Sequence, residues 1–361
     1  MWLVLQLCVW LVATLLSAAL TRAFRARAFA MGLVDRPHSE GHKNHVRATA
    51  VVGGLAMWAS WIALLVLGII GALLIRGLLP EGIRVGLSGL SSAKWSLFVI
   101  ALCATALAVM GAIDDRRALG AGRKLAFQVI VAAVTATFGS RILVGVVPTW
   151  ISWILTVLWL TTIINAMNFF DNMDGLTGGV SLIAFGFFFA IAAVRGQYFV
   201  GLLSALSGGV VLGFLFYNFP KASVFMGDCG SHFLGYLLGV SCIITTFYHH
   251  ENTPSILAVS IPLLVLAVPL LDAVTVVLIR LHLHKPVYVG DNRHISHRFV
   301  ALGLSRPKAV VAIWLLSLLA GTGALALIWT PPTIAFLILA QMLAMVTLIL
   351  LIQLGAHPPE G

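Results

Sequence analysis

The chain carries a succession of apolar runs, each long enough to cross a lipid bilayer as a helix. A spanning helix needs roughly 20 apolar residues, and we count about eleven such runs, although ten spans would also account for the sequence. Charged residues make up only 9% of the chain and apolar residues 60%, whereas about a quarter of a soluble domain is charged. We therefore expect an all-α membrane protein, a polytopic helical bundle that forms one domain over residues 1–361. The predicted spans are 2–20, 51–75, 96–113, 125–139, 149–167, 176–194, 198–217, 233–247, 255–279, 309–328 and 333–353.

Positive charges predict the orientation of the bundle. If the N-terminus lies outside, the loops after odd-numbered spans face the cytoplasm, and 17 of the 22 Lys and Arg residues fall on that side. Because Lys and Arg gather in cytoplasmic loops, we expect the N-terminus outside and the C-terminus in the cytoplasm. The net charge of +10 suits anionic lipid headgroups and anionic substrates, while the basic loops are too short for nucleic acid to be an expected partner. The main cytoplasmic loops are then 21–50, 114–124, 165–176, 217–232 and 280–308.

The acidic residues are few and unevenly placed. Of the 12 Asp and Glu residues, five lie in three of the predicted cytoplasmic loops. Carboxylates crowded at one surface repel one another unless they are protonated, paired with cations or bound to a metal. Oxygen ligands without His or Cys spacing favour Mg²⁺, or Mn²⁺ in its place, over zinc, and Mg²⁺ takes few protein ligands and completes its shell with water and phosphates. The five acids, which predict a divalent-metal site for a phosphate-bearing substrate, are Asp114, Asp115, Asp171, Asp174 and Asp228.

Basic side chains lie in the same set of loops. Lys124 follows the first Asp pair, and the loop 280–308 contains Arg293, His294 and His297. Arg, Lys and protonated His form charge-assisted hydrogen bonds with phosphate oxygens. Acids that hold a metal, opposed by these cations, predict a site that binds a diphosphate.

Four local motifs, taken in order along the chain, make this pattern specific. Together they resemble the signature motifs of the polyprenyl-phosphate N-acetylhexosamine-1-phosphate transferases, over roughly residues 30–305. The motifs are Asp114-Asp115 with Lys124, Asn165-Ala-Met-Asn-Phe-Phe-Asp-Asn-Met-Asp-Gly-Leu176, Val224-Phe-Met-Gly-Asp-Cys-Gly-Ser231 and Arg293-His-Ile-Ser-His297.

The resemblance implies a function and a setting. The expected reaction transfers N-acetylhexosamine-1-phosphate from UDP-N-acetylhexosamine to polyprenyl (undecaprenyl) phosphate, releases UMP and depends on Mg²⁺. The expected place is a bacterial inner membrane, where the product would initiate a cell-surface polysaccharide. A homodimer is compatible with the resemblance, since dimers occur among relatives.

The resemblance also implies roles for individual residues. The metal ligands would be Asn168 and Asp228, and the catalytic residues would be Asp114, Asp115, Lys124 and His294. The residues that bind the sugar nucleotide would be Asp171, Asp174, Asn218, Phe225, Arg293 and His297. A phosphomonoester has its second pKa near 6, so the lipid phosphate is mostly dianionic at pH 7 without a base. We therefore expect Asp114 to orient it or to accept a proton briefly, and Asp115 to support Lys124 or the metal shell.

Two segments depart from the family pattern. Ser296 stands where His-rich versions of the fourth motif carry another histidine, which favours GlcNAc-1-phosphate as the transferred group. The alternative within the family is the phospho-MurNAc-pentapeptide transfer of peptidoglycan synthesis. The first cytoplasmic loop, with Asp35 and His45, resembles the amino-terminal motif in altered form, because Ala48 and Ala50 occupy positions that are often proline.

A secondary transporter is the alternative from another class of protein. Transporters hold their polar groups near the membrane midplane, commonly between inverted repeats, whereas the acids here lie at one surface and no repeat is visible in the sequence. Asp272 is the exception, because it falls inside the run 255–279. A charge at mid-membrane costs roughly 2.5–3.5 kcal/mol, so we expect Asp272 to face the bundle interior with a partner, either for structural pairing or for function.

Overall fold

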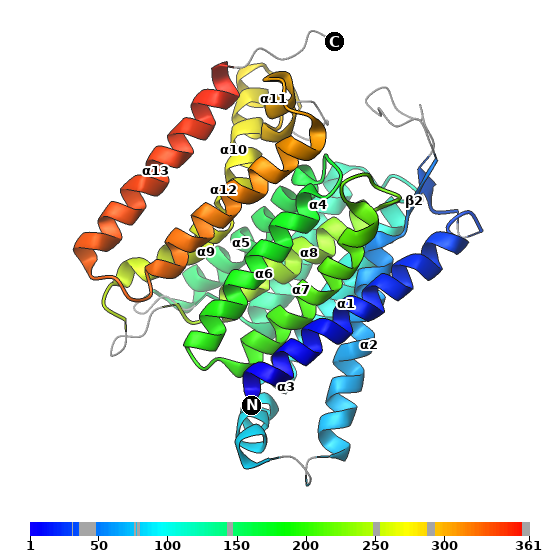
Figure 1. Ribbon diagram of the computed structural model, residues 1–361, viewed down its shortest axis with the longest axis vertical. Helices are drawn as coiled ribbons and strands as arrows, with labels where there is room; N and C mark the ends of the chain where they lie inside the picture. Colours follow the sequence, from blue (N-terminus) through cyan, green and yellow to red (C-terminus); the bar gives the residue numbers. More distant parts are fainter. Residues whose placement is uncertain are drawn as a thin grey trace.

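The protein is a bundle of long apolar helices (Figure 1). The computed structural model describes residues 1–30, 32–35, 48–75, 77, 80–142, 147–247, 253–286 and 293–355. Within these ranges, nine helices are long and apolar enough to cross a membrane, and one bent pair gives a tenth candidate. The predicted fold class is therefore confirmed. The nine are α1 (Trp2–Arg27), α2 (Gly53–Leu74), α3 (Glu81–Asp114), α4 (Ala121–Val134) with its π-helical continuation η2 (Thr135–Gly139), α5 (Thr149–Phe170), α6 (Leu176–Val194), α7 (Tyr198–Asn218), α12 (Arg306–Ala326) and α13 (Pro332–Gly355).

The predicted count of about eleven spans differs from the structure at α8 (Gly227–Ile244). This helix forms where the sequence predicts the span 233–247, but its first turns carry Asp228, Ser231 and His232 and shorten its apolar part. Neighbouring helices rather than lipid surround it, since it packs against α2, α3 and α5 and is buried from Cys229 to Cys242. In the structure α8 is therefore the central helix, and its N-terminal end carries the polar residues.

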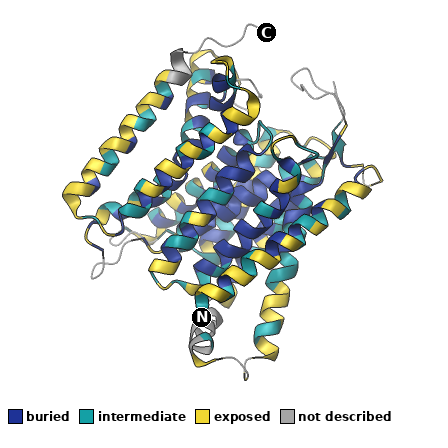
Figure 2. Cartoon of the chain, in the orientation of Figure 1, coloured by how far each residue is buried: buried dark blue, intermediate teal, exposed yellow. Residues whose placement is uncertain are grey.

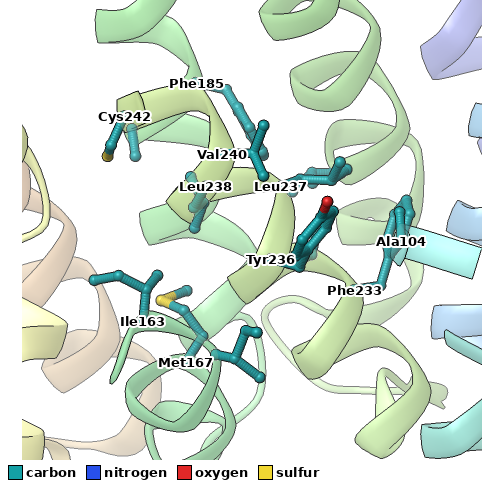
Figure 3. Close-up of a cluster of buried hydrophobic side chains, with 14 of the residues drawn as sticks. Ala104, Ile163, Met167, Phe185, Phe233, Tyr236, Leu237, Leu238, Val240 and Cys242 are labelled. Carbon is teal, nitrogen blue, oxygen red and sulfur yellow. The ribbon is translucent and has the colours of Figure 1, made fainter. Parts of the chain in front are cut away.

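Side chains of α8 form the middle of the hydrophobic core. Figure 3 shows Leu238 of α8 on the side of Ile163 and Met167 of α5, and Phe233 of α8 beside Ala104 of α3. The outer faces of the peripheral helices are also apolar but exposed, as Figure 2 shows for α1 and α13. Apolar side chains on both the inside and the outside are expected of a bundle that lipid surrounds.

Glycines bring three helix backbones together at one end of α8. A Cβ added to Gly54 of α2 would lie 2.2 Å from the backbone nitrogen of Gly230, and one on Gly111 of α3 would lie 2.4 Å from the backbone of Asp228. Small residues permit such close helix packing within membranes. The first turn of α8 is therefore fixed between α2 and α3.

A small sheet, which the all-helical prediction did not include, joins the first loop to α8. Strand β1 (Val34–Asp35) pairs antiparallel with β2 (Thr49–Val51), and β2 pairs parallel with β3 (Val224–Phe225). Strands this short carry no alternation of apolar and polar residues that a sequence pattern could reveal. His45, which belongs to the altered amino-terminal motif, lies outside the described residues.

The predicted span 255–279 is broken into two directions. It consists of η3 (Ile256–Ser260), α9 (Ile261–Val265) and α10 (Ala267–His282), and the two halves are bent by 68°. Pro262 and Pro269 lack the backbone N–H group that a continuous helix would use. After the break, α10 leads to the upper end of the bundle in Figure 1, where the short helix α11 (Ile295–Ala301) also lies.

Candidate active site

The predicted motif segments meet at one end of the bundle. They comprise the ends of α3, α5 and α7 and the beginnings of α4 and α8. Because α3, α5 and α7 are separated along the chain by spans of opposite direction, their C-terminal ends emerge on the same side. The expected convergence of distant loops is therefore present in the structure.

Lys124 links two of the predicted acids. Its Nζ donates to Asp114 Oδ2 at 2.9 Å and to Asp228 Oδ2 at 2.8 Å. The side chains of Lys124 and Asp228 are 24% and 27% exposed, so solvent and a ligand can reach both. Asp114 also accepts the backbone N–H group of Leu119 at 2.7 Å, which closes the turn between α3 and α4 and directs Lys124 back over the site.

Asp115 holds the N-terminus of α8. Its two carboxylate oxygens accept the backbone N–H groups of Asp228, at 2.7 Å, and of Cys229, at 3.1 Å. A carboxylate in this position satisfies unpaired donors of the first turn and interacts favourably with the helix dipole. Gly227 precedes the pair with a φ of +70°, and a Cβ there would lie 2.6 Å from Asp115 Oδ2. Asp115 thus fixes the place of Asp228.

Asn168 contacts Asp228, the other predicted metal ligand. Its Nδ2 donates to Asp228 Oδ1 at 3.1 Å and to Ser231 Oγ at 2.9 Å. Ser231 is part of the third motif, but no separate feature of the sequence indicates this contact. Since the amide of Asn can present either its nitrogen or its oxygen after rotation about χ2, the same placement allows Asn168 Oδ1 to face a cation.

The residues predicted to bind the nucleotide form a second group beside this one. Asp174 Oδ2 accepts the backbone N–H group of Ala222 at 2.9 Å. Asn218 is buried, where its Oδ1 accepts the N–H group of Gly175 at 2.7 Å and its Nδ2 donates to the carbonyl of Val224 at 2.9 Å. These bonds tie the loop after α5 to the segment between α7 and α8. The structure therefore gives Asn218 a positioning role in shaping the site.

Phe225 and Asp171 are the other members of this group. Phe225, three residues before Asp228, lies half-buried in β3, where it pairs with Val51 of β2. Asp171 follows the last residue of α5 and is half-buried. Gly175 then adopts a φ of +76°, a left-handed conformation that favours glycine and starts α6.

Burial and neighbouring carboxylates oppose ionisation of two acids in the site. Burial, together with the charge on Asp228, raises the pKa of Asp115 to about 7. Burial is also the main cause that raises the pKa of Asp171 to about 7. Burial opposes ionisation of Asp228 as well, yet hydrogen bonding to Asp114 and the charge on Lys124 outweigh it and lower the pKa of Asp228 to about 2. A further cation would stabilise the ionised form of all these acids.

The donor set fits a magnesium ion that takes few ligands from the protein. Across the described ranges, no three His, Cys, Asp or Glu side chains are arranged to hold a metal by themselves. Mg²⁺ commonly binds through one or two protein oxygens and fills its shell with water and substrate phosphates. Asp228 and Asn168 supply such a pair, beside Asp115 and Asp171, whose pKa values are raised mainly by burial and further by neighbouring carboxylates.

The fourth motif reaches the site through α11. His294 precedes this helix, and its Nδ1 lies 2.6 Å from Oδ2 of Asp272, so Asp272 has the partner that its burial required. Ser296 Oγ donates to Asn172 Oδ1 at 2.5 Å, which joins α11 to the loop after α5. The serine that replaces a histidine of the family pattern thus makes an internal contact.

Arg293 and His297 flank this contact and are both half-buried. The predicted residues therefore form three groups that share one end of the bundle. Direct hydrogen bonds join the first group, Asp114, Asp115, Lys124, Asn168 and Asp228. The second is the nucleotide group around Asp174 and Asn218, and the third is centred on His294.

Comparison with known proteins supports the resemblance that the motifs carry. The profile of "Glycosyl transferase family 4" matches residues 97–246, which include the first three motifs. The chain is 29% identical over 352 residues to the "Probable undecaprenyl-phosphate N-acetylglucosaminyl 1-phosphate transferase" of Bacillus subtilis (strain 168), covering 94% of this chain and 91% of that protein.

Two further relatives carry similar names. The "Decaprenyl-phosphate N-acetylglucosaminephosphotransferase" of Mycobacterium tuberculosis (strain CDC 1551 / Oshkosh) is 31% identical over 85% of this chain and 78% of its own length. The "Undecaprenyl-phosphate alpha-N-acetylglucosaminyl 1-phosphate transferase" of Escherichia coli (strain K12) is 28% identical over 82% of this chain and 77% of its own length. With its motifs gathered at one end of a membrane bundle and relatives matched over most of their lengths, this chain belongs to glycosyl transferase family 4.

Proposed function

We propose that this protein transfers GlcNAc-1-phosphate from UDP-GlcNAc to a polyprenyl phosphate and releases UMP. The observation that carries the proposal is the bridge from Lys124 to Asp114 and Asp228, which joins charged groups from three helices at a site open to solvent. The relatives support the identity of the lipid and the sugar, since their names specify undecaprenyl or decaprenyl phosphate and N-acetylglucosamine. The muramyl alternative has no such support.

The reaction exchanges one phosphoanhydride for another. An oxygen of the lipid phosphate attacks the phosphorus that carries the sugar, and the bond from that phosphorus to the bridging oxygen of UMP breaks. The product keeps the sugar on a new diphosphate, and UMP leaves with the electron pair. Because the bond broken and the bond formed are alike, the step needs no ATP. Catalysis then consists of positioning and charge neutralisation.

The protein's own groups supply both the positioning and the charge neutralisation. Lys124 is already placed beside two carboxylates, where its ammonium group can move to a phosphate oxygen when substrate enters. Asp115 keeps Asp228 in place through the first turn of α8. Asp174 and Asn218 hold the loop that would receive the nucleotide. Asp114 would orient the lipid phosphate, because a phosphate dianion does not require a base.

Magnesium completes the proposed site. Asp228 and Asn168 would hold the ion, and it would neutralise charge on the diphosphate during transfer. The positive-inside distribution of Lys and Arg supports a cytoplasmic site, and the bacterial relatives support the inner membrane. The lipid phosphate would then arrive from the bilayer and the sugar nucleotide from the cytosol. The product would start a cell-surface polysaccharide.

A purified-enzyme assay tests the proposal. The detergent-solubilised protein is incubated with undecaprenyl phosphate, MgCl₂ and each of several UDP-sugars labelled in the sugar. We expect the label of UDP-GlcNAc to enter the organic phase, with transfer lost on omission of the lipid or on addition of EDTA. Transfer of a labelled muramyl-pentapeptide substrate in its place would overturn the choice of sugar, and absence of transfer from every sugar would overturn the function.

A further inference from the structure

A buried acid of α10 contacts the residue that immediately precedes α11. Asp272 of α10 is 1% exposed, and His294, which immediately precedes α11, is 4% exposed. Asp272 Oδ2 lies 2.6 Å from His294 Nδ1, and Asp272 Oδ1 accepts the backbone N–H group of Ile295 at 2.7 Å. One carboxylate thus fixes both the start of α11 and the ring that precedes it.

The two contacts determine which nitrogen of His294 can reach a substrate. An ionised carboxylate only accepts hydrogen bonds, so the nitrogen that faces Asp272 must carry a proton. The contact occupies Nδ1 and leaves Nε2 as the nitrogen for other partners. Because Oδ1 is held by Ile295, the carboxylate cannot rotate freely, and the plane of the imidazole ring is set as well.

The same helix is attached to the loop that follows α5. Ser296 Oγ donates to Asn172 Oδ1 at 2.5 Å. Asn172 lies between Asp171 and Asp174 in the sequence. Ile295 also belongs to the same buried cluster as Phe170, at the end of α5. His294 is therefore held beside the loop proposed to receive the sugar nucleotide.

We propose that Asp272 is a positioning residue for the transfer reaction and acts through His294. It keeps a proton on Nδ1 and turns Nε2 toward the diphosphate of the substrate. In the imidazolium form, Nε2–H donates to a phosphate oxygen. In the neutral form, the remaining proton stays on Nδ1. This inference rests on the proposed function, and it gives the buried acid of α10 a task beyond capping α11.

The variant D272N separates the two tasks. An asparagine of the same shape can still offer Oδ1 to the N–H group of Ile295, but it then places Nδ2 and its hydrogens opposite Nδ1 of His294. The neutral ring must move its proton to Nε2, and the imidazolium form loses its acceptor. We expect kcat for GlcNAc-1-phosphate transfer to fall about 10–100-fold, a size found when groups that orient a functional histidine are changed, with KM for UDP-GlcNAc changed less than about threefold.

A double-mutant cycle decides whether the effect passes through the histidine. If Asp272 acts through His294, D272N should lower kcat strongly in the wild-type background and hardly at all in an H294N background. The matched control is T275V, which changes another buried polar residue of α10 whose hydroxyl bonds within the helix, to the carbonyl of Leu271. We expect T275V to keep wild-type kcat. Equal losses from D272N in both backgrounds, or no loss in either, would overturn the inference.

A spectroscopic measurement tests the tautomer without catalysis. In protein labelled with ¹⁵N-histidine, the signals absent from H294N identify His294. We expect its neutral ring to be protonated at Nδ1 in the wild type and at Nε2 in D272N. The same tautomer in both proteins would contradict the role of Asp272, even if the enzyme is active. If the wild type transfers no sugar, the proposed function fails, while this spectrum still decides whether Asp272 fixes the ring.

Discussion

The carboxylate of Asp115 accepts the backbone N–H group of Asp228 at 2.7 Å. Asp115 directly follows α3, whereas Asp228, the proposed metal ligand, lies in the first turn of α8. In this site one carboxylate therefore positions another. The bond is to the backbone of Asp228, which leaves the side-chain oxygens of Asp228 to Lys124 and Asn168.

Replacing Asp115 should therefore affect both stability and activity. D115A removes the acceptor from the first turn of α8, and loss of such a cap costs about 1 kcal/mol, so we expect a lower Tm as well as loss of transfer. D115N keeps an oxygen that can accept one of the two N–H groups and should retain most of the stability. Thermal unfolding of the two purified variants measures the difference. A D115A protein as stable as the wild type would contradict the capping role.

Replacing Lys124 should remove activity while the bundle stays folded. K124M leaves Asp114 and Asp228 without their shared cation and removes a charge that would stabilise the transferring phosphates. Loss of one preorganised donor costs about 10²–10³ in kcat, and we expect a fall of that size. The control is K308M, which removes an exposed lysine at the start of α12. Equal activity of the two variants in the transfer assay would exclude Lys124 from catalysis.

The raised pKa of Asp171 predicts how stability depends on pH. Its pKa is about 7 in the folded protein and 3.8 ordinarily, so between these values the folded state holds more protons than the unfolded state. Stability without metal should therefore fall as pH rises from about 4 through 7. D171N should flatten this decline, and MgCl₂ should counteract it at pH 8 by binding the ionised site. Thermal unfolding at pH 5.5 and pH 8, with and without MgCl₂, measures both effects. A metal-free wild type that is more stable at pH 8 than at pH 5.5 would contradict the raised pKa of Asp171.

Two glycines of α2 provide a matched test of the helix packing beneath the site. In G54A the new Cβ would lie 2.2 Å from the backbone of Gly230, whereas a Cβ on Gly68 of the same helix meets nothing within 4 Å. Overpacking costs about 1–3 kcal/mol, so G54A should lower Tm and displace the first turn of α8, with loss of transfer. G68A should leave both unchanged or raise Tm slightly. Normal activity in G54A would show that the approach of α2 to α8 does not hold the site.

The helical bundle and the convergence of its loops were predictable, because both follow from local features. Each apolar run specifies a helix by itself, and alternate crossings place the ends of α3, α5 and α7 on one side. The motifs and the order of the spans were enough to place Asp114, Lys124 and Asp228 in neighbouring loops, but Asp115 was the acid expected as a partner of Lys124, whereas Lys124 contacts Asp114 and Asp228. The functional roles of these residues stay predictions.

Other features depend on packing between distant segments and leave no periodic signal. The central place of α8 arises from contacts with α2, α3 and α5. Asp272 and His294 pair across a loop. The sequence indicates that Asp272 needs a partner, because it falls inside an apolar run, but it does not indicate that the partner is His294. Asn218 was predicted to contact the nucleotide, yet its amide also serves two backbone groups that only the folded chain brings near.

The fate of one phosphorus atom tests the central claim most directly. UDP-GlcNAc labelled with ³²P in the phosphate next to the sugar is incubated with the protein, undecaprenyl phosphate and MgCl₂, and both phases are analysed. The proposed reaction moves the ³²P into the lipid product together with the sugar and releases unlabelled UMP in equal amount. Retention of the ³²P in the aqueous phase as UDP, with the sugar alone on the lipid, would contradict transfer of sugar-1-phosphate at this site.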